Sequence, residues 1–316
     1  MRAKKPEVKE KRLKMFIYGP AGCGKTLSAI QFPNAVIIDT EKGTDFYSES
    51  ISKAGSVVFQ SNDPEEILDE IQGLLTTKHE YKTLILDPVT QIYNALQEKW
   101  NRIFEKYATT EKEKEVQDFG MRYWGKVKSQ YKRMQRLLTK LDMNVIATSH
   151  QKDVYGANFS KIGTTYDSMK GEDYFFDIIF QIEKRGDDRL CKTIKERAEI
   201  GGHKFPEEFA WSYKNFCDFY GKDILEREST PTPMATPEQV QKLERLVKVV
   251  NLDTDIIVKW LTKADVDSTA EMTSEQIQKC IEYVEKQLAE INPAPVSNGQ
   301  AAPEAVKEAI KGKGGK

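Results

Sequence analysis

The stretch Gly19-Pro20-Ala21-Gly22-Cys23-Gly24-Lys25-Thr26 fits the pattern G-x-x-x-x-G-K-[ST] at every fixed position. An apolar run, residues 13–18, precedes it, and residues 26–32 follow as a helical segment that ends at Pro33. A phosphate-binding loop needs this order of strand, turn and helix, because glycines let successive backbone N–H groups converge on phosphate oxygens. The positive end of the helix dipole adds to that attraction. The stretch therefore predicts a site for a nucleoside triphosphate.

Three side chains are predicted to act on the phosphates and on a magnesium ion. Lys25 is expected to reach the β- and γ-phosphates, and the Thr26 hydroxyl to ligate Mg²⁺. The later run Thr83-Leu84-Ile85-Leu86-Asp87 is a short apolar strand that ends in a carboxylate. This is the Walker B pattern, in which the aspartate holds Mg²⁺, usually through water. We therefore expect ATP and Mg²⁺ as cofactors, although the motif alone leaves the choice among nucleoside triphosphates open.

The general base is predicted to be Glu41. Many P-loop ATPases with additional strands place a glutamate directly after the Walker B aspartate, but here Pro88 follows Asp87. Glu41 comes just after the apolar run 35–39, at the strand edge where open α/β sheets bind ligands. There it can orient and deprotonate an attacking water. The alternative is an exposed loop carboxylate.

Two further polar pairs are candidates for contact with the γ-phosphate. Ser149 and His150 end the apolar run 144–148, where such a pair can sense the phosphate and report its loss; otherwise His150 is a loop residue. Lys195 and Arg197 follow the predicted strand 189–194. If that edge faces a neighbouring subunit, they can act in trans on its γ-phosphate. If it does not, they are ordinary surface charges.

Two segments are rich in basic groups, and the second combines them with aromatic rings. Residues 122–140 form an amphipathic helix that carries seven basic residues and no acidic one, with its apolar positions at Trp124, Val127, Tyr131, Met134, Leu138 and Leu141. The long polar segment 151–171 contains three lysines and the aromatic residues Tyr155, Phe159 and Tyr166. Lysines that neutralise phosphates beside rings that stack on bases suit single-stranded DNA. The alternatives are a solvated helix face and a long surface loop.

Composition limits the other classes of function. The 316 residues carry a net charge of −1, so a DNA-binding surface must be local. The four cysteines have no C-x-x-C spacing, which argues against a disulfide framework or a structural zinc. No apolar run reaches the length of a membrane span, and the N-terminus lacks the apolar core of a signal peptide. We expect a soluble, cytoplasmic protein that does not bind a membrane.

The chain is predicted to divide into five parts. A basic arm, with seven Lys or Arg against two Glu, is expected to be solvated. A linker rich in Pro and Thr separates the nucleotide-binding domain from three short amphipathic helices, and the C-terminal residues have the composition of a disordered tail. The predicted boundaries are 1–14 for the arm, 15–227 for the ATPase domain, 228–236 for the linker, 237–290 for the helical domain and 291–316 for the tail.

Over residues 13–211 the chain resembles the RecA-like ATPases, and most closely the compact RecA-like proteins of bacteriophages associated with single-strand annealing and recombination. The resemblance rests on these stretches in order: Gly19 to Thr26, Ile38-Asp39-Thr40-Glu41, Leu84-Ile85-Leu86-Asp87, Ala147-Thr148-Ser149-His150 and Lys195-Glu196-Arg197. It implies an α/β fold, in which a mainly parallel sheet is flanked by helices, beside the small C-terminal helical domain.

The same resemblance implies roles for several residues. Glu41 is implied as the catalytic glutamate, and Ser149 with His150 as the phosphate sensor, where RecA-like proteins often have Asn-Gln. Lys195 and Arg197 correspond to inter-subunit fingers. Residues 107–121 and 152–171 correspond to the DNA-facing loops, and Asp45 with Tyr47 lie near the expected adenine site.

The leading hypothesis is an ATPase that binds single-stranded DNA, supports phage-type recombination or annealing, and assembles with copies of itself as a ring or filament. The C-terminal helices are expected to bind a single-strand-binding or replication protein. Two alternatives stay open: a nucleotide-switched partner-loading module, and a motor ATPase that acts on duplex DNA.

Overall fold

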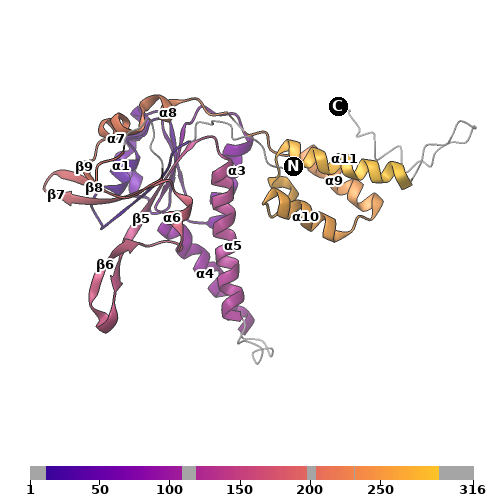
Figure 1. Ribbon diagram of the computed structural model, residues 1–316, viewed down its shortest axis with the longest axis horizontal. Coiled ribbons are helices and arrows are strands. Elements are labelled where there is room, and N and C mark those ends of the chain that lie inside the picture. Colours follow the sequence, from indigo (N-terminus) through magenta and orange to yellow (C-terminus); the bar gives the residue numbers. More distant parts are fainter. Residues whose placement is uncertain (1–11, 109–118, 198–203, 231, 292–316) are drawn as a thin grey trace, which may run out of the picture. The chain divides into compact units, whose positions relative to one another are not determined.

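The computed structural model describes residues 12–108, 119–197, 204–230 and 232–291. Figure 1 shows the elements in chain order. The chain folds as two compact units, Met1–Pro231 and Thr232–Lys316. No helix in the described ranges is long and apolar enough to cross a membrane.

The first unit is built on a mostly parallel sheet of nine strands, counted over the described residues. The order is β3-β2-β4-β5-β1-β7-β8-β9, with β6 paired to β5. The pairs from β3 to β7 along this order are parallel, whereas β8, β9 and β6 pair antiparallel. The strands are β1 Lys14–Gly19, β2 Ala35–Asp39, β3 Val57–Gln60, β4 Thr83–Asp87, β5 Asn144–Tyr155, β6 Lys161–Tyr166, β7 Ile178–Arg185, β8 Asp188–Glu196 and β9 Glu208–Ala210.

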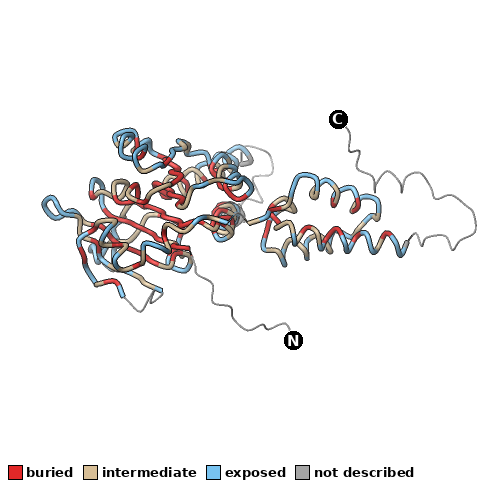
Figure 2. The backbone as a smooth tube through the Cα atoms, turned by 90° about the horizontal axis from the view of Figure 1, so that it is seen from above, coloured by how far each residue is buried: buried red, intermediate tan, exposed pale blue. Residues whose placement is uncertain are grey.

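Helices flank this sheet, so the predicted mixed α/β class with a mainly parallel sheet is confirmed. Every residue of β2 and β4 is buried, as expected for parallel strands covered on both faces. Figure 2 shows buried segments inside this unit and exposed ones at its periphery. The helices of this unit are α1 Lys25–Ala29, α2 Ser48–Lys53, α3 Pro64–Thr76, α4 Val89–Ala108, α5 Phe119–Lys140, α6 Glu172–Phe175, α7 Tyr213–Tyr220 and α8 Lys222–Glu226.

Three helices show how the local sequence sets helix boundaries and buried faces. Asp63 caps α3 by accepting hydrogen bonds from the backbone N–H groups of Glu65 and Glu66. In α5 and at the residue after it, the predicted apolar positions are buried except Trp124, which is 42% exposed although it lies one turn before the buried Val127. The α1 helix ends at Ala29, earlier than the sequence pattern suggested.

The expected long polar loop at residues 151–171 was wrong in its first part. Strand β5 continues through Tyr155 and turns back into β6, so these residues form a hairpin. The polar side chains of this segment predicted a loop. Backbone hydrogen bonds between the two strands nevertheless hold it as a hairpin. Strand β7 starts at Ile178, because α6 occupies the residues before Phe176.

The N-terminal arm is described only from Arg12, and residues 1–11 lie outside the described part. Arg12 is buried, contrary to the expectation of a solvated arm up to residue 14. Its guanidinium pairs with Asp142 at 2.9 Å and donates to the backbone carbonyls of Arg227 and Glu228. These partners satisfy a charge that could not otherwise be buried. Most of the first predicted DNA-facing loop, residues 109–118, and the predicted tail lie outside the described residues.

The second unit is helical. Its described helices are α9 Pro237–Val250, α10 Thr254–Ala264 and α11 Ser274–Ile291. Thr236 and Gln239 form a reciprocal capping box at the start of α9, next to Pro237 in the first turn. The apolar faces of α9 and α11 meet in a small core that includes Leu243, Leu246, Ile277, Ile281 and Val284.

A buried polar network joins α5 to the segment after the β5/β6 hairpin. Glu172 accepts hydrogen bonds from the Tyr131 hydroxyl, from Ser168 at 2.9 Å and from Gln135 at 3.0 Å. Burial raises the pKa of Glu172 to about 7, although these hydrogen bonds oppose the shift. The folded protein therefore takes up a proton at this carboxylate at a higher pH than the unfolded chain does.

We predict that this carboxylate makes the stability of the first unit depend on pH. Its folded pKa of about 7 lies above the unfolded value of 4.5, so its stabilising contribution is complete below pH 4.5 and is lost as pH rises through 7. The loss is on the order of 3 kcal/mol, because the pKa differs by about 2.5 units at 1.36 kcal/mol per unit. Unfolding midpoints at pH 5.5 and 8 should differ less in Glu172→Gln than in the wild type. Equal differences in the two proteins would contradict the assignment.

Candidate functional site

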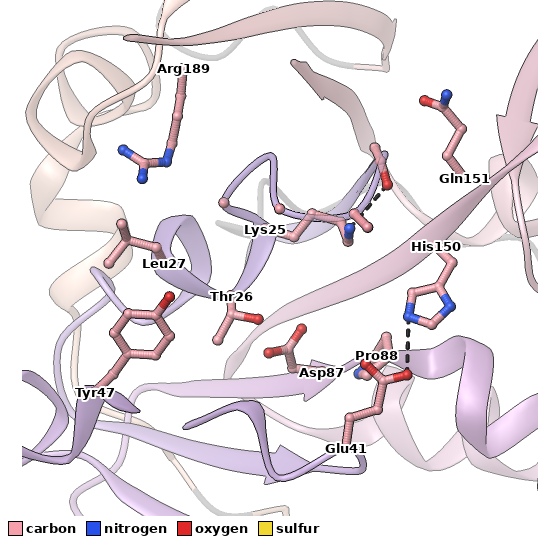
Figure 3. A pocket seen from close by; sticks show the side chains of 14 residues that line it. Lys25, Thr26, Leu27, Glu41, Tyr47, Asp87, Pro88, His150, Gln151 and Arg189 are labelled. Atoms are coloured by element: carbon pink, nitrogen blue, oxygen red, sulfur yellow. Dashed lines mark hydrogen bonds and ion pairs between the residues drawn. The ribbon is translucent and has the colours of Figure 1, made fainter. Parts of the chain in front are cut away.

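A pocket of about 480 Å³ lies at the carboxyl ends of β1 and β4 and beside the middle of β5. Figure 3 shows its side chains, which come from the P-loop, from the segment after β2, and from β5 and β8. The lining residues are Gly19, Ala21, Gly22, Gly24, Lys25, Thr26, Leu27, Glu41, Tyr47, Asp87, Pro88, His150, Gln151 and Arg189. Six of the eight P-loop residues and two predicted catalytic side chains, Glu41 and His150, therefore face one cavity.

The glycines of the P-loop are required by backbone shape and by space. Gly24 has φ +95°, a left-handed conformation that disfavours any side chain. A Cβ at Gly19 would lie 2.3 Å from the carbonyl oxygen of Ile182 on β7, so the loop packs directly on the sheet. The Lys25 ammonium donates to the carbonyls of Gly19 at 3.0 Å and Pro20 at 2.9 Å. The loop thus orients this cation within its own curve, where it can meet a phosphate oxygen.

The two predicted Mg²⁺ ligands contact each other. The Thr26 hydroxyl and the Thr148 hydroxyl both hydrogen-bond to the Asp87 carboxylate, which is almost fully buried. Burial raises the pKa of Asp87, and the negative charges of Asp39 and Glu41 raise it further. A divalent cation would offset this concentration of negative charge, and hydroxyl and carboxylate oxygens are the ligands that Mg²⁺ prefers. The residues present therefore fit the metal.

The segment that carries Glu41 is fixed to the Walker B strand. Asp39 and Asp87 are register partners in the parallel pair β2/β4, and the Thr40 backbone N–H donates to the Asp87 carbonyl at 2.9 Å. Asp39 accepts from the backbone N–H groups of Glu41, Gly43 and Thr44 and from the Thr44 hydroxyl. Burial opposes ionisation of Asp39, but these hydrogen bonds prevail and lower its pKa. Asp39 is therefore an anionic anchor that positions Glu41.

Glu41 contacts two polar side chains from neighbouring elements. Its Oε1 atom lies 3.0 Å from Nε2 of His150 and accepts a hydrogen bond of 2.6 Å from Gln91 on α4. Figure 3 shows His150 pointing down to Glu41 across the mouth of the pocket. Glu41, the candidate general base, is therefore held in place by an imidazole on β5 and an amide on α4.

Three predicted γ-phosphate contacts lie away from the pocket. Ser149 is fully buried, and its hydroxyl contacts Thr90 at 3.1 Å and the carbonyl of Asp167 at 3.1 Å. Side chains alternate along a strand, so Thr148 and His150 face the site and Ser149 faces away. Lys195 donates to the carbonyls of Asp173 and Phe176, and Arg197 pairs with Asp177 at 3.0 Å and donates to the carbonyl of Tyr174.

The sequence assigns no firm role to four residues that lie at or beside the site. Thr148 was read only as the end of an apolar run, although the alternation of β5 gives a signal for it. Gln91 and Arg189 have no local motif, because tertiary packing brings α4 and β8 to the site. Tyr47 lines the pocket, whereas Asp45 accepts a hydrogen bond of 2.6 Å from Gln60 and lies outside it.

A comparison with protein families gives a match over the part of the chain that contains the P-loop. A family model described as AAA domain matches residues 11–198, which is more than half of the chain. Among solved structures, the chain is similar to the one titled "Crystal structure of the RadB recombinase", with 16% identity and a TM-score of 0.34. That alignment covers 58% of this chain and 80% of the other. A search of curated proteins gave no match.

We predict that Glu41→Gln keeps nucleotide binding but slows release of inorganic phosphate from ATP by about 10²–10⁴-fold, because an amide cannot accept the proton of an attacking water. Steady-state phosphate release and binding of a fluorescent nucleotide measure the two properties. Glu49→Gln is the matched control, since Glu49 is an exposed α2 carboxylate that pairs with Lys53 and does not line the pocket. A wild-type hydrolysis rate in Glu41→Gln would refute the assignment of the base.

Proposed function

We propose that this chain, which belongs to the AAA domain family, is a Mg²⁺-dependent ATPase that binds single-stranded DNA and supports phage-type recombination or annealing. Nucleotide-controlled self-assembly is part of the proposal. The observation that carries it is the continuity of β5, which lines the nucleotide pocket at His150 and then extends into an exposed hairpin. One strand thus joins a nucleotide-sensing side chain to a candidate DNA surface.

The hairpin has the features that binding to unpaired bases requires. Beyond the pocket, Tyr155 is 58% exposed, Phe159 is 92% exposed and Ile162 is 67% exposed. Figure 1 shows the β5/β6 hairpin reaching beyond the rest of the sheet. Exposure of these three apolar side chains to water is unfavourable, so a binding partner that covers them is favoured. Bases of single-stranded DNA can stack on the two aromatic rings.

Basic side chains near the hairpin are partly neutralised within the chain. Lys152 pairs with Asp167 at 3.0 Å, and Lys161 pairs with Asp153 at 2.7 Å. On α5, Lys126, Lys128 and Lys132 are exposed. Contacts between these lysines and backbone phosphates would make DNA binding salt-dependent, while stacking would supply the preference for single strands.

The proposed assembly assigns Lys195 and Arg197 to a neighbour's γ-phosphate. Both side chains lie outside the pocket of their own chain and are partly exposed, which supports a role in trans. Their present partners are mostly backbone carbonyls of residues 173–176, and the pKa of Lys195 is lowered by burial and by the charge of Arg197. A phosphate at the subunit interface would relieve this repulsion between the two cations.

One observation favours the alternative of a nucleotide-switched partner-loading module. The C-terminal unit has a groove of about 350 Å³ that is lined by Trp260, Lys263, Met272 and Tyr283 among others. Aromatic walls beside a lysine suit an acidic peptide with an apolar side chain, such as a segment of a single-strand-binding or replication protein. If no DNA binds at low salt, this alternative replaces the main proposal.

We predict that a labelled single-stranded oligonucleotide binds more tightly with a non-hydrolysable ATP analogue than without nucleotide, and that Tyr155→Ala and Phe159→Ala each weaken binding about tenfold. The reason is the loss of stacking, about 1–3 kcal/mol per base. Fluorescence anisotropy across a salt series measures both effects, with duplex DNA as competitor. Tyr283→Ala, in the other unit, is the matched control. Tighter binding to duplex DNA would support the motor alternative instead.

A mixing experiment tests the shared site. Arg197→Ala and Lys25→Ala should each abolish most ATP hydrolysis alone, because one removes the finger and the other the phosphate-binding lysine. Mixed subunits should regain activity, since some interfaces then pair an intact Lys25 with an intact Arg197. Arg185→Ala, at the exposed end of β7, should stay active without a partner. A mixture as inactive as its components would refute action in trans.

A further inference from the structure

Arg189 lies over the P-loop with its Nε atom unpaired. It occupies the second position of β8, and its side chain reaches across the loop so closely that a Cβ at Gly24 would lie 2.1 Å from Nε. This atom is inaccessible to solvent and has no hydrogen-bond acceptor. The Nε–H group of this guanidinium is thus a buried donor without an acceptor. A guanidinium has five such donors and remains charged at any physiological pH.

A buried, unsatisfied donor at this position is costly in the chain alone. Leaving a donor of a charged group without an acceptor costs more than leaving a neutral donor unsatisfied. Most arginines reduce this cost with a carboxylate or with backbone carbonyls, as Arg12 and Arg197 do in this chain. The acidic residues that line the pocket, Glu41 and Asp87, are instead engaged with His150, Gln91, Thr26 and Thr148.

The position of Arg189 within the pocket indicates which part of a ligand it would meet. The Mg²⁺ candidates and Glu41 define the end of the pocket where the terminal phosphate would react. Arg189 lies toward the other end, together with Leu27 and Tyr47. Figure 3 shows Arg189 and Tyr47 on opposite sides of Leu27, both directed into the pocket.

We propose that Arg189 binds the nucleotide of its own chain at the nucleoside end, where its planar guanidinium and the Tyr47 ring form the two walls of the base and sugar site. This inference rests on the proposed ATP binding and adds a residue to it. An arginine can stack on a base by its planar face and donate hydrogen bonds to ligand oxygens from its edge. Because the contact does not involve the γ-phosphate, Arg189 acts on ATP and ADP alike.

The test measures the affinity of Arg189→Ala for fluorescent ATP and ADP analogues in the presence of Mg²⁺. We expect both affinities to fall by the same factor, about tenfold. Arg189→Lys should lose less affinity than Arg189→Ala, because it keeps the positive charge. It should still bind more weakly than the wild type, because it lacks the planar group. Lys184→Ala is the matched control: Lys184 is the cross-strand partner of Arg189 on β7, is exposed, and does not line the pocket.

The outcomes separate this inference from the proposed function. If the wild type binds neither ATP nor ADP, the proposed function fails, and the role of Arg189 fails with it. If the wild type binds and Arg189→Ala binds both nucleotides equally well, only the role of Arg189 is refuted. A loss confined to ATP would place the side chain at the γ-phosphate and overturn the nucleoside assignment. The unfolding midpoint without nucleotide should be unchanged in Arg189→Lys, which excludes a purely structural effect.

Discussion

The parallel register of β2, β4 and β5 is the constraint on which the site depends. It places Asp39 beside Asp87, and the Thr40 hydrogen bonds to the Asp87 and Pro88 carbonyls fix the segment that follows. A shift of one residue in either pair would turn a strand's side chains to the opposite face. Glu41 would then leave the pocket, and the Thr148 hydroxyl would no longer contact Asp87. The geometry of the candidate site at this edge is therefore a result of strand pairing.

The P-loop depends on the same sheet from the other side. Gly19 ends β1 and packs against the backbone of β7, while Gly24 lies under Arg189 of β8. The loop is thus enclosed by strands that occur more than 150 positions later in the chain. Its glycines supply backbone N–H groups for phosphates, and they also leave the space that the later strands need.

The site also connects to surfaces on which the proposed DNA binding depends. Glu41 contacts β5 through His150 and α4 through Gln91, and β5 leads directly into the exposed hairpin. At the base of that hairpin, Ser168 and Glu172 are tied to Tyr131 of the basic helix α5. The two surfaces with basic or aromatic character are therefore linked to each other by a buried network and to the pocket by a continuous strand.

By itself, the sequence determined the α/β class, the P-loop, Asp87 as the end of the Walker B strand and the position of Glu41 at the same edge. These features follow from local signals: a fixed motif, apolar runs of strand length, and Pro88 in the place of a glutamate. Only the tertiary structure decided that Ser149 faces away while Thr148 faces Asp87, since one residue of strand register separates the two outcomes. It also brought Gln91 to Glu41 and Arg189 to the pocket, because those contacts join residues far apart in the chain, and it paired the polar segment after His150 into a hairpin.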